Sequence, residues 1–198
     1  MKTIILFSLA LVILAANAAR APAPVLDIHG KYLHTKAKYI ANLLVGRSDG
    51  ALYALNFGKK SCSLGVGVIY NEEEGYPLIF TPVNPKKGVI HLSTDVNIKF
   101  SASNDCNESS VWRVKYDKGM KQNVVMVGGV EGNPGPKTLE NWFKIEKTKD
   151  GYKLVFCPSV CSYCKVTCKD VGIVKDKDGW LHLALSNEPL SVTFYRTY

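Results

Sequence analysis

Four of the six cysteines in this chain fall within residues 157–168, at the spacing C-x3-C-x2-C-x3-C. Just before them, polar and apolar residues alternate over 142–146, a turn ends at Gly151, and residues 152–156 are rich in aromatic and branched side chains. An alternating run, a short turn and a second strand-like run predict a β-hairpin. A hairpin that leads directly into clustered cysteines predicts a fold of short strands held together through sulfur, by disulfides or by a metal ion.

The N-terminus indicates the compartment in which these sulfur atoms react. Lys2 precedes an apolar run over residues 4–16, and small residues close the run at Ala16-Asn17-Ala18. This pattern predicts a secretory signal peptide at residues 1–18, removed after Ala18. The run is too short to span a bilayer comfortably, and no later run is apolar for long enough. Residues 19–198 are then expected to form one domain of a protein that enters the secretory pathway and becomes extracellular or vacuolar.

An exported chain matures under oxidising conditions, so an even number of cysteines predicts disulfides. A zinc site is the alternative, but the spacing lacks two separated C-x2-C pairs and no histidine lies close by. Six cysteines allow fifteen pairings, among which the sequence alone does not choose. The spacing favours a nested arrangement in which Cys157 bonds Cys168 and Cys161 bonds Cys164, which leaves Cys62 to bond Cys106.

The rest of the chain is a series of short apolar segments separated by turn residues, and no stretch after residue 18 keeps a helical period. The predicted strands are residues 39–45, 51–55, 66–70, 77–80, 89–92, 96–100, 111–116, 123–127, 142–146, 152–157, 171–174, 180–185 and 190–195. Turns are predicted between them, for example at Ser48-Asp49-Gly50 and Asp178-Gly179. Strands this short and evenly spaced predict an all-β barrel or a related closed architecture.

A weak internal repeat accompanies these strands. Residues 111–114 and 142–145 are both alternating segments with a tryptophan, each followed by a charged turn that ends in glycine. Residues 179–183 are a looser third copy. A repeat of this kind indicates pseudo-symmetry without specifying the fold.

Several long motifs resemble the plant Kunitz family of the soybean trypsin inhibitor type, and within it the miraculin-like, tumour-related branch. They are residues 25–31 with Tyr39-Ile40, then 81–90, 93–98, 128–136, 141–173 and 183–186. The resemblance extends over essentially the whole mature chain. It implies a β-trefoil, with six hairpins, pseudo-threefold symmetry and a barrel closed by a cap, and it implies the disulfide pairing given above. The cysteine that joins subunits in miraculin has no counterpart near Glu146, so we expect a monomer without a disulfide-linked dimer.

The resemblance also implies an inhibitory loop between the fourth and fifth strands, presented to a protease in a substrate-like shape. By position this loop contains Thr81, Pro82, Val83, Asn84, Pro85, Lys86, Lys87 and Gly88. Inhibitory relatives carry Ser-Pro-Tyr-Arg-Ile there, with the arginine in the specificity pocket. Counting forward from Pro82 places Asn84 at that position, whereas counting back from Phe100 places Lys86 there. We expect Lys86 or Lys87 to enter an acidic pocket, and the prolines and the Cys62–Cys106 ring to stiffen the loop.

Other classes of function find little support in the sequence. His29, His34, His91 and His182 have no serine and aspartate at motif spacing, and exposed strand positions explain them. No enzyme activity, metal or cofactor is therefore expected. After loss of the signal peptide, 24 basic and 17 acidic residues leave a charge of +7. This charge is spread over many turns, so neither nucleic acid nor a membrane is an expected partner. Asn107-Glu108-Ser109 is a glycosylation sequon in a predicted surface loop.

Together these features predict a secreted, defence-related plant protein that inhibits proteases. Serine endopeptidases are the expected targets. The alternative is a storage, taste-modifying or ligand-binding protein of the same family whose loop does not inhibit.

Overall fold

The computed structural model describes residues 21–198, apart from residues 46–47, 58–61, 73 and 105. The predicted signal peptide lies outside the described residues. Within the part that is described, no helix has the length and apolar character needed to cross a membrane.

The described chain consists of short strands and two 3-10 helices, which confirms the all-β prediction. The elements are β1 (Lys38–Val45), β2 (Ser48–Leu55), β3 (Gly65–Tyr70), β4 (Leu78–Pro82), η1 (Pro85–Lys87), β5 (Val96–Phe100), β6 (Arg113–Asp117), β7 (Gln122–Met126), η2 (Pro136–Asn141), β8 (Lys144–Lys147), β9 (Tyr152–Phe156), β10 (Lys169–Lys175), β11 (Leu181–Ser186) and β12 (Ser191–Thr197). Alternation explains the strands: in β4, Leu78, Phe80 and Pro82 are buried, and the two residues between them are half-buried.

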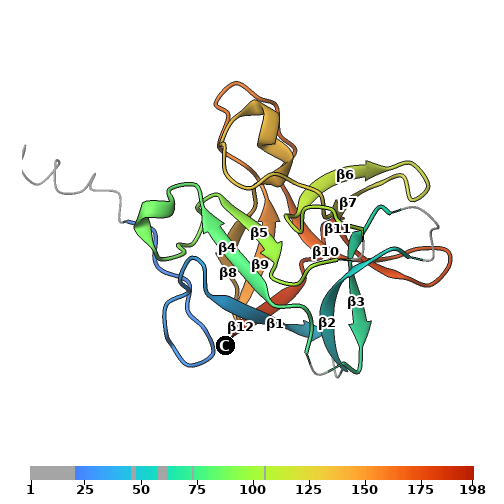
Figure 1. Ribbon diagram of the computed structural model, residues 1–198, viewed down its shortest axis with the longest axis horizontal. Coiled ribbons are helices and arrows are strands. Elements are labelled where there is room, and N and C mark those ends of the chain that lie inside the picture. Colours follow the sequence, from blue (N-terminus) through green and yellow to red (C-terminus); the bar gives the residue numbers. More distant parts are fainter. Residues whose placement is uncertain (1–20, 46–47, 58–61, 73, 105) are drawn as a thin grey trace, which may run out of the picture.

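All strands belong to one antiparallel sheet that closes on itself (Figure 1). Consecutive strands pair as hairpins: β2 with β3, β4 with β5, β6 with β7, β8 with β9, and β10 with β11. β12 pairs with both β9 and β1, and β11 pairs with β3, so the first and last strands of the chain meet. Closure leaves few free strand edges, which suits a fold made of short strands.

Aromatic side chains from distant strands fill the interior. Phe80 of β4 meets Phe194 of β12 with ring centroids 5.3 Å apart, and Trp112 contacts both Phe100 and Phe143 edge-on. These five residues are all buried. Burial of one such side chain contributes about 1.5–3 kcal/mol to stability. Each of these ring contacts joins segments that are far apart in the sequence. The core therefore forms only when the sheet has closed.

The predicted strand at residues 89–92 is wrong. This segment forms only isolated bridges, His34 with Val89 and Pro24 with His91. Its backbone bonds instead to the N-terminal segment: Ile90 N–H donates to the Leu33 carbonyl, and the Ile90 carbonyl accepts from Val25 N–H, both at 2.9 Å. The segment is apolar because Ile90 is fully buried in the core, and not because the segment is a strand.

Most predicted strand boundaries differ by one to three residues from those in the structure, and three local features were predicted wrongly or missed. Ser48-Asp49-Gly50 is not a turn, because β2 begins at Ser48 and Val45 already pairs with Ser48. Residues 46–47, which follow Val45, lie outside the described part. The two 3-10 helices were not predicted, since three to six residues are too few to display a helical period. Trp142 caps η2 rather than beginning β8.

The repeat of tryptophans holds for two copies. Trp112 and Trp142 are almost fully buried, and both segments bridge to β5, through Val111 with Lys99 and Phe143 with Val96. Trp180 of the third copy is 42% exposed.

Candidate functional site

The β4–β5 hairpin positions the predicted inhibitory loop. The two strands pair from Leu78 with Phe100 to Pro82 with Val96, so the connection between them spans residues 83–95. Thr81 and Pro82 belong to β4, where Thr81 is half-buried and Pro82 is buried. Of the predicted loop residues, Val83, Asn84, Pro85, Lys86 and Lys87 are exposed and Gly88 is half-buried. The exposed part of the predicted loop is thus five residues at the end of a hairpin.

The backbone of this exposed part is not extended throughout. Asn84 is extended, with φ −112° and ψ 93°, but Pro85, Lys86 and Lys87 form the single turn of η1. Pro85 fits the start of a helix because its φ is already near the helical value. Gly88 ends the turn with φ 68°, a conformation that glycine adopts without strain. A substrate-like shape therefore exists at Asn84 and not at the two lysines.

The distal half of the loop is bonded to the N-terminal segment. Thr35 N–H donates to the Gly88 carbonyl at 3.0 Å, and Leu92 N–H donates to the Ala23 carbonyl at 2.8 Å. Buried Ile90 packs between these two bonds as part of the main core. The exposed residues therefore lie between β4, which precedes them, and residues 88–92, which follow them and are bonded to the N-terminal segment.

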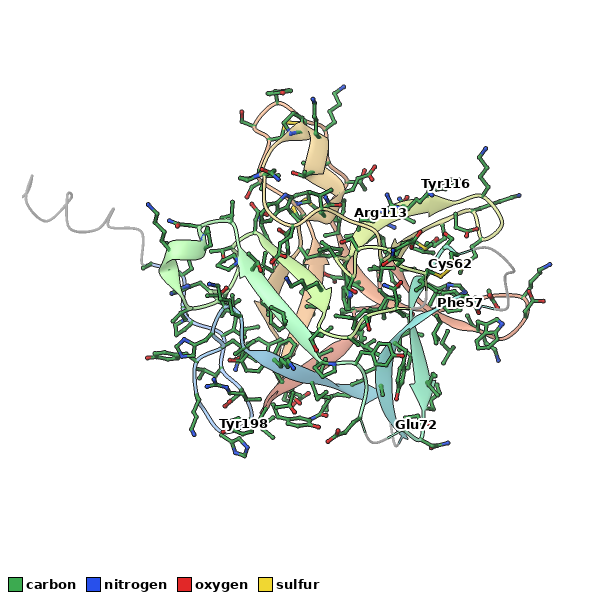
Figure 2. The ribbon with its side chains drawn as sticks, in the orientation of Figure 1. Phe57, Cys62, Glu72, Arg113, Tyr116 and Tyr198 are labelled. Carbon is green, nitrogen blue, oxygen red and sulfur yellow. A yellow bond between two sulfur atoms is a disulfide. The ribbon has the colours of Figure 1, made fainter. Side chains whose placement is uncertain are left out.

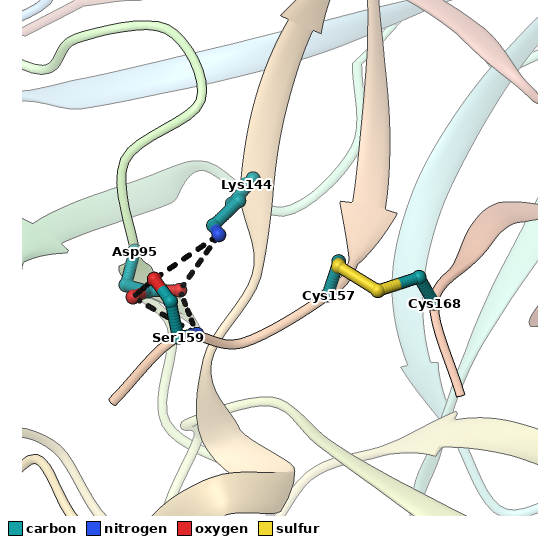
Figure 3. The surroundings of a disulfide bond; sticks show 5 residues. All are labelled: Asp95, Lys144, Cys157, Ser159 and Cys168. Carbon is teal, nitrogen blue, oxygen red and sulfur yellow. Dashed lines mark hydrogen bonds and ion pairs between the residues drawn. A yellow bond between two sulfur atoms is a disulfide. The ribbon is translucent and has the colours of Figure 1, made fainter. Parts of the chain in front are cut away.

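Asp95 fixes the other end of the connection (Figure 3). Its backbone carbonyl accepts the Val83 N–H at 2.9 Å, directly across the base of the loop. Its buried carboxylate accepts from Ser159, from N–H at 3.1 Å and from Oγ at 2.5 Å, and lies 3.7 Å from Lys144 Nζ. Ser159 belongs to the segment between Cys157 and Cys168. Asp95 therefore joins the candidate loop to the disulfide-linked region.

All six cysteines lie in the described part of the chain, and each is paired: Cys62 with Cys106, Cys157 with Cys168 and Cys161 with Cys164. These are the pairs that the sequence and the resemblance predict. That the Cys62–Cys106 ring stiffens the candidate loop stays a prediction, and the bond lies away from the exposed part of that loop. Figure 2 shows Cys62 near the β2–β3 hairpin, on the opposite side of the molecule from the green η1 turn. The bonds that the structure shows at the loop itself are those to the N-terminal segment and to Asp95.

The histidines are not all at exposed strand positions. His182 is 4% exposed, its Nε2 lies 2.8 Å from Asp176 Oδ2, and its ring stacks on Phe57 with centroids 3.7 Å apart. Burial raises the pKa of Asp176, but the bonds from His182 and from two backbone N–H groups outweigh it and lower that pKa below its ordinary value. Asp176 lies in the turn after β10 and His182 in β11, so the pair joins the turn to the strand that follows it. No group of three or more potential metal ligands occurs among the described residues.

Asn107 of the sequon is exposed and adopts a left-handed φ of 53° beside Cys106. Its side chain is therefore accessible in the folded protein.

The sequence did not single out Asp95 or Glu131 as functional candidates, although both lie in the motifs that carry the family resemblance. Glu131 accepts hydrogen bonds from Thr81 and from Lys99 Nζ, the latter at 2.6 Å. An isolated acidic residue between glycines gives no sign of a partner 50 residues away.

The closed, disulfide-linked sheet thus presents the hydrogen-bonded β4–β5 connection at its surface. Residues 25–196 match the model of the legume Kunitz family, described as "Trypsin and protease inhibitor". The chain therefore belongs to the plant Kunitz family, which confirms the resemblance.

Particular relatives support the same assignment. The chain is 43% identical to miraculin of Synsepalum dulcificum over 96% of its length and 93% of the relative. It is 42% identical to Kunitz trypsin inhibitor 5 of Arabidopsis thaliana over 88% of this chain and 86% of the relative. Among solved structures, a Kunitz-type cysteine protease inhibitor from potato is 33% identical and superposes with a TM-score of 0.78, covering 90% of this chain and 99% of that one.

Proposed function

We propose that the protein is a secreted inhibitor of endopeptidases, primarily of the serine class, and that it binds its target through residues 81–88. The observation that carries this proposal is the exposed segment from Val83 to Lys87, which presents two cations and is bonded at both ends. A loop that is already ordered loses little entropy on binding, so its contacts contribute more fully to affinity. The inhibitors among the named relatives support the same activity.

Lys86 is the residue that we propose to enter the specificity pocket. Its ammonium can pair with an acidic pocket floor, whereas Asn84 is neutral and is followed by proline. Engagement of Lys86 in a substrate-like shape requires η1 to open. The turn is held by two long bonds, from Lys87 N–H to the Asn84 carbonyl at 3.2 Å and from Lys86 N–H to Asn84 Oδ1 at 3.3 Å. Bonds of this length are weak, so opening costs about 1 kcal/mol for each.

We also propose a β-trefoil architecture with six hairpins and pseudo-threefold symmetry. Its support is the closed sheet, the succession of hairpins and the two equivalent tryptophan segments that bridge to β5. We propose in addition that residues 1–18 direct export and are removed, that residues 19–198 form one domain, and that Asn107 is glycosylated. With every cysteine paired within the chain, the protein is expected to remain a monomer without an intersubunit disulfide.

The first experiment is an inhibition panel with the purified mature protein against trypsin, chymotrypsin, subtilisin and papain. Inhibition of trypsin is the expected result, because trypsin accepts lysine in an acidic pocket. Absence of inhibition throughout the panel would contradict the proposal. It would favour the alternative of a storage, taste-modifying or ligand-binding protein, which the helical turn at the two lysines also favours.

The second experiment substitutes the cation itself. Lys86→Ala is expected to raise the inhibition constant for trypsin at least about tenfold, because loss of a buried interfacial charge pair costs about 2–5 kcal/mol. Lys87→Ala is expected to have a smaller effect. Lys118→Ala, in the exposed turn between β6 and β7, is the matched control and should leave the constant unchanged. Equal constants for all four proteins would show that this loop is not the inhibitory one.

A further inference from the structure

A short segment from a distant part of the sequence crosses the base of the β4–β5 hairpin. We call residues 130–132, between β7 and η2, the strap. The Glu131 carboxylate accepts a hydrogen bond from Thr81 Oγ1 of β4 through one oxygen and from Lys99 Nζ of β5 through the other, the latter at 2.6 Å. One side chain of the strap therefore bonds to both strands of the hairpin that carries the candidate loop.

Buried amide groups hold the strap itself. Asn97 of β5 is 1% exposed, and its Oδ1 accepts the Gly132 N–H at 2.7 Å while its Nδ2 donates to the Asn141 carbonyl at 2.8 Å. Asn141 in turn donates from Nδ2 to the Val130 carbonyl at 3.2 Å. Thr81 and Asn97 are partners in the β4–β5 register, so both sets of bonds meet at the last pairs before the loop leaves the sheet. The strap is thus anchored independently of Glu131.

The exposed end of the loop borders a pocket. Pro85 and Lys86 line this pocket of about 480 Å³, together with Thr81, Lys99 and Glu131. Because η1 begins at Pro85, shortly after β4 ends at Pro82, the position of η1 depends on how firmly β4 is held at Thr81. A displacement at that point would be carried to the exposed residues, which begin two positions further on.

The carboxylate is suited to this holding role at neutral pH. Burial raises the pKa of Glu131, but the hydrogen bonds from Lys99 and Thr81 and the charge of Lys99 outweigh it and lower that pKa below its ordinary value. The group is therefore ionised, and hydrogen bonds to an ionised carboxylate are stronger than those between neutral groups.

We propose that Glu131 is a positioning residue for inhibition: by bonding Thr81 and Lys99 it keeps the end of β4 in place and so keeps the loop of residues 83–87 ordered. The role rests on the proposed inhibitory function of that loop. A loop held in this way binds a protease and is cut slowly, whereas a loosened loop reaches the shape of a normal substrate more often and is cut faster.

The test compares Glu131→Ala with the matched control Glu140→Ala, an exposed acidic residue of η2 in the same connection. Three quantities are measured: the inhibition constant for trypsin, the rate at which a trace of trypsin cleaves after Lys86 or Lys87, followed by mass spectrometry, and the melting temperature. Loss of two hydrogen bonds to a charged group is expected to raise both the inhibition constant and the loop cleavage rate about tenfold. Cleavage after Lys118 in the distant β6–β7 turn and the behaviour of Glu140→Ala should not change.

Two further variants separate positioning from general loss of stability. Glu131→Gln keeps an acceptor for Thr81 but loses the charge. Its inhibition constant and its loop cleavage rate should therefore lie between those of the wild type and those of Glu131→Ala. Thr81→Val removes the hydroxyl, and its effect on the cleavage rate should be smaller in the presence of Glu131→Ala than alone, because the two groups share one bond.

The possible results have distinct meanings. Unchanged loop cleavage in Glu131→Ala, or equal acceleration after Lys86 and Lys118, would overturn the positioning role. If the wild type does not inhibit trypsin, the proposed function fails, yet the ratio of cleavage rates still reports whether Glu131 orders the loop.

Discussion

At the scale of single residues, a few charged and polar side chains join segments that are far apart in the sequence. Asp95 bonds Val83 through its backbone and Ser159 through its carboxylate, so one residue connects the candidate loop and the disulfide region. Burial of a carboxylate costs free energy, and this cost is offset only when all of its hydrogen bonds are made.

The pair of half-buried Asp176 and buried His182 leads to a prediction about pH. The folded-state pKa of Asp176 lies below its ordinary value of 3.8, so folding favours the ionised form. Its contribution to stability is therefore complete well above pH 3.8 and is lost as the pH falls through the folded-state pKa. We expect Asp176→Asn to lower the free energy of unfolding by about 1 kcal/mol at neutral pH and to have less effect at low pH.

The measurement is urea-induced unfolding of the wild type and variant at pH 7 and at low pH. Asp178→Asn is the control, because Asp178 lies exposed in the same turn. A difference between Asp176→Asn and wild type that stays constant across the pH range would show that the ionised carboxylate is not the source of the stability.

At the scale of elements, the register of each hairpin decides which residues leave the sheet. The pairing of β4 with β5 ends at Pro82 and Val96, and this pairing, rather than the identity of the loop residues, sets the exposed segment at 83–87. The same dependence explains why residues 89–92 are not a strand, since their backbone groups bond to the N-terminal segment.

Close contact between β10 and the turn after β11 leads to a prediction about Gly172. A Cβ added at Gly172 would lie 2.2 Å from the Glu188 carbonyl oxygen and 2.8 Å from Ser186 Cβ. Because the nearest atom belongs to the backbone, the strand or the turn must shift. We expect Gly172→Ala to reduce the free energy of unfolding by about 1–3 kcal/mol, measured by urea denaturation.

Gly119→Ala is the corresponding control. A Cβ there would meet only the side-chain oxygen of Asp117, at 3.2 Å, in an exposed turn. A loss of stability as large in Gly119→Ala as in Gly172→Ala would mean that the effect comes from glycine replacement in general and not from the contact.

At the scale of the whole molecule, sheet closure and disulfides restrict the chain over different distances. Pairing of β1 with β12 joins the two ends of the domain, whereas the Cys62–Cys106 bond closes a sequence separation of 44 and the Cys161–Cys164 bond a separation of only 3. A longer closed loop removes more conformational freedom from the unfolded chain.

Removal of each bond is therefore expected to have a different cost. On the loop-entropy relation, Cys62→Ser with Cys106→Ser should lower the free energy of unfolding by about 4 kcal/mol, and Cys161→Ser with Cys164→Ser by about 2 kcal/mol. Denaturant unfolding of the two double variants measures the difference. If the short bond proves as costly to remove as the long one, native-state contacts of the loops and not unfolded-state entropy govern their stability.

The features that could be predicted from the sequence are local in origin. Alternation and turn residues indicated the all-β class and most strands, because a strand displays its period of two within five residues. The cysteine spacing and the family resemblance indicated the three disulfides, and the same resemblance located the candidate loop on the β4–β5 hairpin.

The remaining features depend on contacts between distant segments, which exist only in the folded protein. Pairing with the N-terminal segment made residues 89–92 a bridged loop, and burial against Phe57 made His182 an interior residue. The bonds by which Asp95, Asn97 and Glu131 hold the candidate loop likewise join distant segments. No local pattern encodes them, because a hydrogen bond between Glu131 and Thr81 exists only after the closed sheet has brought the two residues together.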